Sequence, residues 1–173
     1  RDYSVEEPVT DAEFEAFRRM FEYERLPLNE VTESVDTVEH WIRETITFDL
    51  PYGERGGLFL HLPRQGQGPF QPIMYWGGSG ILSLRSIDEQ WIQEFDYMLL
   101  DGRAVAVPWF KGAYGRDDPD PTAPAFPGPM TGIAYRDATI KWVTDLSVTL
   151  DYLETRPDID VEHVGFYGFS FGA

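Results

Sequence analysis

Apolar side chains recur along the chain with two different periods, and the change of period separates the predicted elements. Near the N-terminus, apolar residues at helical spacing follow a capping box at Thr10 and Glu13, which predicts a helix over 11–24. Alternating apolar residues over 42–48 and again over 58–62 enclose a glycine-rich turn. This pattern predicts an antiparallel hairpin.

Three short apolar runs follow, over 72–76, 104–108 and 161–167, and they are typical of buried strands. Two helices are expected between them: one follows a capping pattern at Ser86 and Glu89, and the other covers 137–156. Their predicted buried faces are Ile87, Trp91, Phe95 and Met98 in the first helix, and Ile140, Val143, Leu146, Leu150 and Leu153 in the second.

The order of these elements is helix, hairpin, and then strand–helix–strand–helix–strand. Such alternation predicts the α/β class, with a mostly parallel sheet, helices on both faces and right-handed crossovers. The hairpin adds an antiparallel part at the N-terminal side of the sheet.

The last predicted strand runs directly into Gly168-Phe169-Ser170-Phe171-Gly172. A Gly-x-Ser-x-Gly that closes a strand is typical of a nucleophile elbow, a turn so tight that the glycine positions have almost no room for a side chain. Ser170 is therefore the candidate nucleophile, and the backbone N–H of Phe171 is one candidate donor to an oxyanion.

A second oxyanion donor is expected in the glycine-rich loop after 72–76, because the loop after the third strand supplies it in sites of this kind. We favour the N–H of Gly78, with Gly77 or Ser79 as alternatives. The simpler interpretation is that these glycines only make a tight turn between a strand and a helix.

A serine nucleophile needs a base, and none of the three histidines is assigned to this role. His40 precedes the hairpin and His61 lies within it, whereas His163 starts the last strand, roughly 23 Å of extended chain before Ser170. In this architecture the acid and the base follow the serine along the chain, so we expect them outside this sequence.

The segment 114–132 is rich in proline and glycine and is expected to be a long surface loop. Its aspartates, Asp117, Asp118 and Asp120, lack the spacing of a calcium loop, so a solvated acidic loop is favoured over a cation site. Three aromatic residues at its start either line a substrate pocket or pack the loop onto the domain: Trp109, Phe110 and Tyr114.

Composition narrows the choice of partners and compartment. Apolar residues make up 42% and aromatic residues 15% of the 173 residues, which favours a packed domain. A net charge of −16 argues against nucleic acid and anionic membranes as partners. The absence of cysteine excludes disulfides, a cysteine nucleophile and thiolate metal sites, and no cofactor or metal is expected. No apolar run is long enough to span a membrane and the N-terminus does not resemble a signal peptide, so a cytoplasmic protein is expected.

With these residues placed, the chain resembles the α/β-hydrolase superfamily, and within it the dienelactone-hydrolase and acetyl-xylan-esterase-like domains appended to some bacterial serine/threonine protein kinases. The resemblance runs from about residue 15 to the end, and the run from Asp151 to Asp160 is its most specific part. The matching stretches are Phe48 to Arg55, Gly102 to Val105, Phe110 to Tyr114, Tyr135 to Asp137, Leu150 to Asp160 and Tyr167 to Gly172.

The resemblance implies an α/β-hydrolase fold that this chain carries only up to the elbow, with residues 1–36 as an N-terminal helical extension and 37–173 as the N-terminal part of the hydrolase domain. Two departures matter. Gly77 stands where the family has proline, and the later strands with the acid and the histidine are absent. Dienelactone hydrolases proper use cysteine, so Ser170 points to the esterase side of that branch.

Two functions are consistent with these observations. The first is a serine esterase acting on a small-molecule ester, in which this chain supplies Ser170, Phe171 and Gly78. The C-terminal remainder of the domain, either a second polypeptide or further sequence of the same one, supplies the acid and base. The alternative is a non-catalytic hydrolase-like module for binding or regulation. Because the elbow strand is central in this fold, we also expect residues 1–173 alone to be insoluble or inactive.

Overall fold

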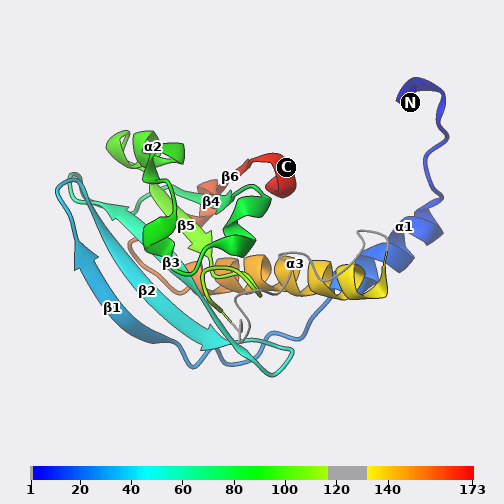
Figure 1. Ribbon diagram of the computed structural model, residues 1–173, viewed down its shortest axis with the longest axis horizontal. Helices are drawn as coiled ribbons and strands as arrows, with labels where there is room; N and C mark the ends of the chain where they lie inside the picture. Colours follow the sequence, from blue (N-terminus) through cyan, green and yellow to red (C-terminus); the bar gives the residue numbers. More distant parts are fainter. Residues whose placement is uncertain (1, 117–131) are drawn as a thin grey trace.

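The computed structural model describes residues 2–116 and 132–173, and in these ranges six strands form one twisted sheet (Figure 1). The strands are β1 (Val31–Thr37), β2 (Trp41–Asp49), β3 (Arg55–Pro63), β4 (Pro72–Trp76), β5 (Ala104–Pro108) and β6 (Gly165–Gly168). Their order across the sheet is β1-β2-β3-β5-β4-β6.

The sheet is mixed, which corrects the prediction of a mostly parallel one. β1–β2, β2–β3 and β3–β5 pair antiparallel, whereas β5–β4 and β4–β6 pair parallel. Parallel pairing requires a crossover that returns the chain to the same end of the sheet. Within the described residues, parallel pairs form only among β4, β5 and β6, the strands that such crossovers join. The α/β class and the predicted β2–β3 hairpin are confirmed.

Strand β1 was not predicted, because its sequence carries few apolar residues. All seven of its residues are exposed, and it lies at the edge of the sheet, paired with β2 from Val31 to Thr37. The segment expected as a helical extension therefore also holds most of a strand. The division of the chain into two parts at residue 36 stays a prediction.

Three α-helices lie in the described residues: α1 (Asp11–Arg18), α2 (Asp96–Leu100) and α3 (Ile133–Leu153). The remaining helical turns are 3₁₀: Tyr3–Val5, Arg19–Phe21, Ser79–Ser83, Ile87–Glu89, Ile92–Glu94, Val161–His163 and Ser170–Gly172. The capping box of α1 is present as predicted, with Glu13 N–H donating to the Thr10 hydroxyl and Thr10 N–H donating to the Glu13 carboxylate.

The two faces of the sheet are covered by different helices (Figure 1). Leu58 and Leu60 of β3 pack toward α3 together with Val148 and Leu153, while Phe59 of β3 faces the layer that contains α2. Alternation along a strand sends successive side chains to opposite faces, so a strand buried on both sides is apolar throughout. This explains why nearly all of β3 is buried.

The expected helix after Ser86 is replaced by two 3₁₀ turns and the short α2. Its capping pattern is only half formed: Ser86 accepts from Asp88 N–H, but the Glu89 carboxylate accepts from Arg85 N–H rather than from Ser86. The backbone becomes extended at Trp91, whose side chain is 73% exposed instead of buried.

Helix α3 covers most of the predicted range, but its buried face differs from the predicted stripe. Of the five predicted residues Leu153 is buried, and the other four are half-buried. The fully buried face is rotated about the helix axis relative to the predicted stripe, and it includes Trp142, Asp145 and Tyr152. Because this face contains the polar residue Asp145, a prediction based on apolar residues does not identify it as the buried face.

Candidate active site

The turn that follows β6 places Ser170 in an unusual backbone conformation. Its φ is +54°, in the left-handed region, and the residue is exposed at the start of the 3₁₀ turn Ser170–Gly172. A non-glycine residue in this region costs of order 1–3 kcal/mol, and such strain is concentrated at functional sites. The predicted sharp turn at Ser170 is therefore present.

Close backbone packing explains the two glycines of the motif. A Cβ atom at Gly168 would lie 2.1 Å from the carbonyl oxygen of Gly172, and a Cβ atom at Gly172 would lie 2.1 Å from the carbonyl oxygen of Trp76. Real Cβ atoms do not approach oxygen so closely, so neither position accepts a side chain without displacement of the backbone. The spacing Gly-x-Ser-x-Gly is thus a steric requirement of this turn.

The loop after β4 lies directly beside the elbow. Because β4 and β6 are adjacent and parallel, their carboxyl ends meet at one edge of the sheet, and Phe169 N–H donates to the carbonyl oxygen of Trp76 at 3.1 Å. An ideal Cβ at Gly78 would lie 3.2 Å from the Phe169 ring and 3.6 Å from Cβ of Ser170. Gly78 and Ser170 are therefore neighbours, and a side chain at position 78 would fill the space between them.

The backbone around these residues is held firmly. Gly172 N–H donates to the carbonyl of Phe169 at 3.0 Å, and the Phe171 ring packs edge-on against Trp76 and Trp142. No oxygen in residues 2–116 or 132–173 accepts a hydrogen bond from the N–H of Gly78. The roles of Ser170, Phe171 and Gly78 in catalysis stay predictions, but the structure brings the three residues together.

A cavity of about 230 Å³ borders the elbow on the side of the Gly78 loop. It is lined by Gly78, Gly80, Ile81, Leu84, Glu89, Gln90, Trp91, Glu94 and Phe169. Phe169 belongs to both the cavity and the elbow, and Gly78 in the cavity wall is a neighbour of Ser170, so the cavity opens next to the elbow. The sequence analysis did not identify this cavity, because it assigned Trp91 to the buried face of a regular helix.

Two residues that line this cavity, Gln90 and Glu94, belong to a chain of hydrogen bonds. The hydroxyl of Tyr75 and the side-chain amide of Gln90 both donate to Oε2 of Glu94, and the hydroxyl of Tyr114 donates to Oε1 of Gln90 at 2.9 Å. Burial, reinforced by the Glu94 carboxylate, raises the pKa of Tyr75, so its phenol stays protonated and donates. A carboxylate is thus fixed in position in the wall of the cavity that borders the elbow.

The aromatic residues that open the loop after β5 pack into the core. Phe110 is 1% and Tyr114 is 2% exposed, and the half-buried Trp109 contacts the ring of Phe59. Of the two interpretations left open by the sequence, the structure thus favours packing. The aspartates at 117, 118 and 120 lie outside the described residues.

None of the three histidines lines the cavity at the elbow. His61 is buried between the rings of Trp41 and Phe95, and burial lowers its pKa to about 3, so it is neutral over the physiological range. His163 is exposed and its Nδ1 lies 2.9 Å from Oδ2 of Asp160, while His40 is exposed near the start of β2.

A buried charged cluster ties the loop after β5 to α3. Oδ2 of Asp145 accepts from the N–H of Lys111 at 2.8 Å and from Arg116 at 2.9 Å, and the hydroxyl of Tyr52 donates to its other oxygen. Both Asp145 and Arg116 are at least 95% buried. The cluster fixes the segment that leads away from the end of β5.

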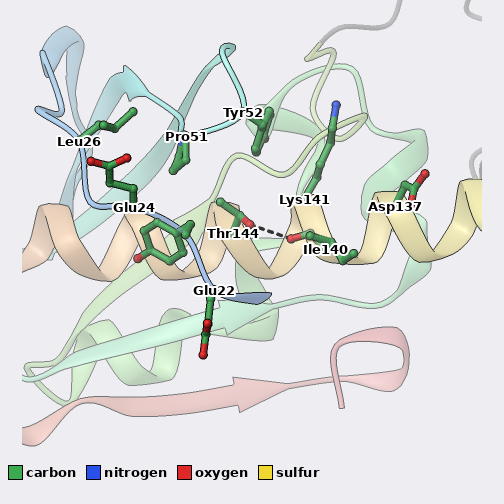
Figure 2. A pocket seen from close by; sticks show the side chains of 10 residues that line it. Glu22, Glu24, Leu26, Pro51, Tyr52, Asp137, Ile140, Lys141 and Thr144 are labelled. Carbon is green, nitrogen blue, oxygen red and sulfur yellow. Dashed lines mark hydrogen bonds between the residues drawn. The ribbon is translucent and has the colours of Figure 1, made fainter. Parts of the chain in front are cut away.

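A second cavity, of about 450 Å³, lies between α3, the turn after β2 and the segment that follows α1 (Figure 2). It shares no lining residue with the elbow cavity. The Thr144 hydroxyl in its wall donates to the carbonyl of Ile140 at 2.9 Å, as the dashed line in Figure 2 shows. That hydroxyl is engaged within its own helix, so we assign no chemistry to this cavity.

The described residues thus define an α/β protein with a strained, exposed serine at the carboxyl edge of a mixed sheet. Solved esterases share this fold. Acetyl xylan esterase 1 from Thermoanaerobacterium sp. matches with a TM-score of 0.63 and 16% identity over 95% of this chain and 52% of that one. An acetyl xylan esterase from Paenibacillus sp. matches with a TM-score of 0.57 and 15% identity over 91% of this chain and 50% of that one.

A glucuronoyl esterase from Solibacter usitatus also matches, with a TM-score of 0.53 and 20% identity over 92% of this chain and 53% of that one. The chain spans about half the length of these esterases. At such identities the likeness shows the fold, and it supports the predicted hydrolase-type α/β fold in its coarse form. No family model matches the chain, and no curated protein matches it.

Within the described ranges, no helix has both the length and the apolar character needed to cross a bilayer. The predicted cytoplasmic location and the predicted link to protein kinases stay predictions.

Proposed function

We propose that this chain is the nucleophile-bearing part of a serine hydrolase that acts on carboxylic esters by acyl-enzyme chemistry. The observation that carries the proposal is the left-handed Ser170, exposed at a turn and adjacent to the Gly78 loop. A strained nucleophile at the carboxyl edge of an α/β sheet is the arrangement that acyl transfer uses. The shared fold with solved esterases is consistent with it.

In the proposed reaction, Oγ of Ser170 attacks the acyl carbon while a base removes its proton. The carbonyl oxygen gains negative charge and accepts hydrogen bonds from the N–H groups of Phe171 and Gly78. When the tetrahedral intermediate collapses, the C–O bond to the alcohol breaks and the alcohol leaves with the proton from the base. Water then releases the acid and restores the Ser170 hydroxyl.

The base and its orienting acid are proposed to come from the C-terminal remainder of the hydrolase domain, in the same or a second polypeptide. In the described part of this chain no histidine lines the elbow cavity, which fits this division of roles. The substrate class is a small-molecule ester.

A fluorophosphonate probe tests the proposal, because it reacts covalently with activated serines. The complete protein is expected to be labelled, and peptide mapping is expected to place the label on Ser170. Ser170→Ala is the negative variant, and Ser34→Ala, which changes an exposed serine on β1, is the matched control. If the folded, complete protein takes up no label at Ser170, the proposal is wrong and the non-catalytic module is favoured.

A further inference from the structure

The aromatic ring of Phe171 lies between two tryptophan side chains. Its centroid is 5.1 Å from that of Trp142 and 5.8 Å from that of Trp76, and both contacts are edge-to-face. The ring and the backbone N–H of Phe171 are attached to the same Cα atom. Contacts that hold the ring therefore also limit how far this N–H, the candidate oxyanion donor, turns away from the carbon that Ser170 attacks.

One of the two tryptophans links the elbow to α3 and to the segment after β5. Trp142 is 2% exposed, and its indole N–H donates to the carbonyl oxygen of Lys111 at 2.8 Å. The N–H of Lys111 in turn donates to Oδ2 of Asp145 at 2.8 Å, about one turn further along the same helix. Both backbone polar groups of Lys111 are thus bonded to α3, and the same indole reaches the ring of Phe171.

The hydrogen bond to Lys111 gives the indole a direction. A purely apolar side chain of similar size could fill this space in more than one rotamer. The indole of Trp142 would leave a buried donor without its acceptor if it turned, which is costly. Tyr135 also packs edge-on against it, with the ring centroids 5.9 Å apart. Trp142 therefore contacts Phe171 as a side chain with one fixed orientation.

The other tryptophan has further contacts that Trp142 lacks. The ring of Trp76 stacks on Phe110 at 4.7 Å, and its carbonyl oxygen accepts from the N–H of Phe169 at 3.1 Å. A substitution of Trp76 would therefore disturb the end of β4 together with the ring contact. Trp142 reaches the elbow from a different element, so its replacement tests the support of Phe171 separately from the sheet.

These contacts suggest a role for Trp142 beyond filling the core. We propose that Trp142 is a positioning residue for the oxyanion site: it holds the ring of Phe171 against α3 and thereby directs the N–H of Phe171 toward the oxyanion. This inference rests on the proposed function, because the N–H of Phe171 has this role only in an acyl-transfer site. It predicts an effect on the transition state that is absent from substrate binding.

The kinetic test uses the complete protein, p-nitrophenyl acetate and Trp142→Phe, which removes the indole N–H. We expect kcat to fall about tenfold or more and KM to stay within about twofold. Phenylboronic acid forms a tetrahedral, anionic adduct with an active serine, and its inhibition constant is expected to rise by a similar factor. The matched control is Val148→Ala, a buried residue of α3 in the other core cluster. It is expected to lower the urea midpoint and to leave kcat within about twofold.

A double-variant cycle tests whether Trp142 acts through Phe171. Phe171→Leu keeps the N–H but removes the ring, and it is expected to lower kcat as Trp142→Phe does. The double variant is then expected to lose no more than Phe171→Leu alone, within about twofold. Unchanged kcat in Phe171→Leu overturns the inference even where Trp142→Phe does not fold.

The outcomes separate this inference from the proposed function. Fluorophosphonate labelling of Ser170 together with unchanged kcat in Trp142→Phe overturns the positioning role alone. Multiplying losses in the double variant, a loss confined to KM, or an equal fall of kcat in Val148→Ala does the same. A folded, complete protein that takes up no label at Ser170 refutes the proposed function and the positioning role with it.

Discussion

The Cβ atom of any residue other than glycine at position 172 would lie 2.1 Å from the carbonyl oxygen of Trp76. The backbone at the end of the elbow thus packs closely against the end of β4, where Phe169 N–H also donates to the carbonyl oxygen of Trp76 at 3.1 Å. The elbow is therefore shaped by the neighbouring strand as much as by its own turn.

The first prediction follows from this contact. Gly172→Ala is expected to lower the free energy of unfolding by about 1–3 kcal/mol, because the nearest atom that the new Cβ meets, the carbonyl oxygen of Trp76, belongs to the backbone and cannot rotate away. It is also expected to slow fluorophosphonate labelling of Ser170. Urea unfolding of the complete protein and the labelling rate measure the two effects.

Gly80→Ala is the control, since a Cβ atom at Gly80 meets nothing within 4 Å. It is expected to be neutral or slightly stabilising. If both variants unfold at the same urea concentration, the close packing at Gly172 is not a constraint in the protein.

The second prediction concerns the strain at Ser170. Ser170→Gly is expected to be more stable than Ser170→Ala by about 1 kcal/mol, because glycine adopts a φ of +54° without a steric penalty. Both variants lose the hydroxyl, so their comparison isolates the backbone. Equal unfolding midpoints for the two variants would show that the turn at Ser170 is relaxed.

The third prediction separates the N–H of Gly78 from the space around it. Gly78 has a φ of −66°, which proline also adopts, so Gly78→Pro removes the N–H with little change in backbone conformation. If this N–H stabilises the oxyanion, kcat for p-nitrophenyl acetate falls about 10²–10³-fold. Gly78→Ala adds a Cβ near Phe169 but keeps the N–H, and it is expected to lose far less. A similar loss in both variants would assign the effect to crowding.

The neighbourhood of Gly78 and Ser170 could be predicted from sequence, whereas the cavity beside them could not. The strand before each residue is a short apolar run, and adjacent parallel strands end at the same edge of a sheet. The hydrogen bonds at the cavity wall instead join Tyr75, Gln90 and Glu94, which come from a strand and from irregular turns. No periodicity links such residues, and a helical pattern even assigned Trp91 to the core.

Some strands of the sheet could likewise be predicted from the sequence, and one could not. The alternation of apolar residues in β2 and β3 predicted their hairpin, although in the structure β3 is buried on both faces. β1 was not predicted, because its pairing with β2, rather than a buried apolar face, holds it in place. Hydrophobic patterns predict which residues are buried, and they do not predict strands that are held chiefly by backbone hydrogen bonds.

The fourth prediction tests the buried pair of Asp145 and Arg116. Asp145→Ala removes the carboxylate that, among the described residues, lies closest to the buried guanidinium of Arg116, so the free energy of unfolding is expected to fall by about 3–5 kcal/mol. Asp137→Ala breaks the exposed pair with Arg136 on the same helix and is expected to cost less than about 1 kcal/mol. Urea unfolding of both variants compares them. Equal losses would show that burial of this pair has no energetic consequence.

The last prediction is a pH dependence that originates at His61. Because burial lowers the pKa of His61 to about 3, the unfolded chain, with an ordinary histidine pKa near 6.5, binds a proton that the folded protein does not. The contribution of His61 to the free energy of unfolding is therefore at its maximum above about pH 6.5, and it declines as the pH falls toward 3. Between pH 7 and pH 5 the loss is about 2 kcal/mol for one proton.

Urea unfolding at a series of pH values is expected to show this slope in the wild-type protein and in His40→Leu, which changes an exposed histidine, but not in His61→Leu. A slope that survives in His61→Leu would assign the proton to another group.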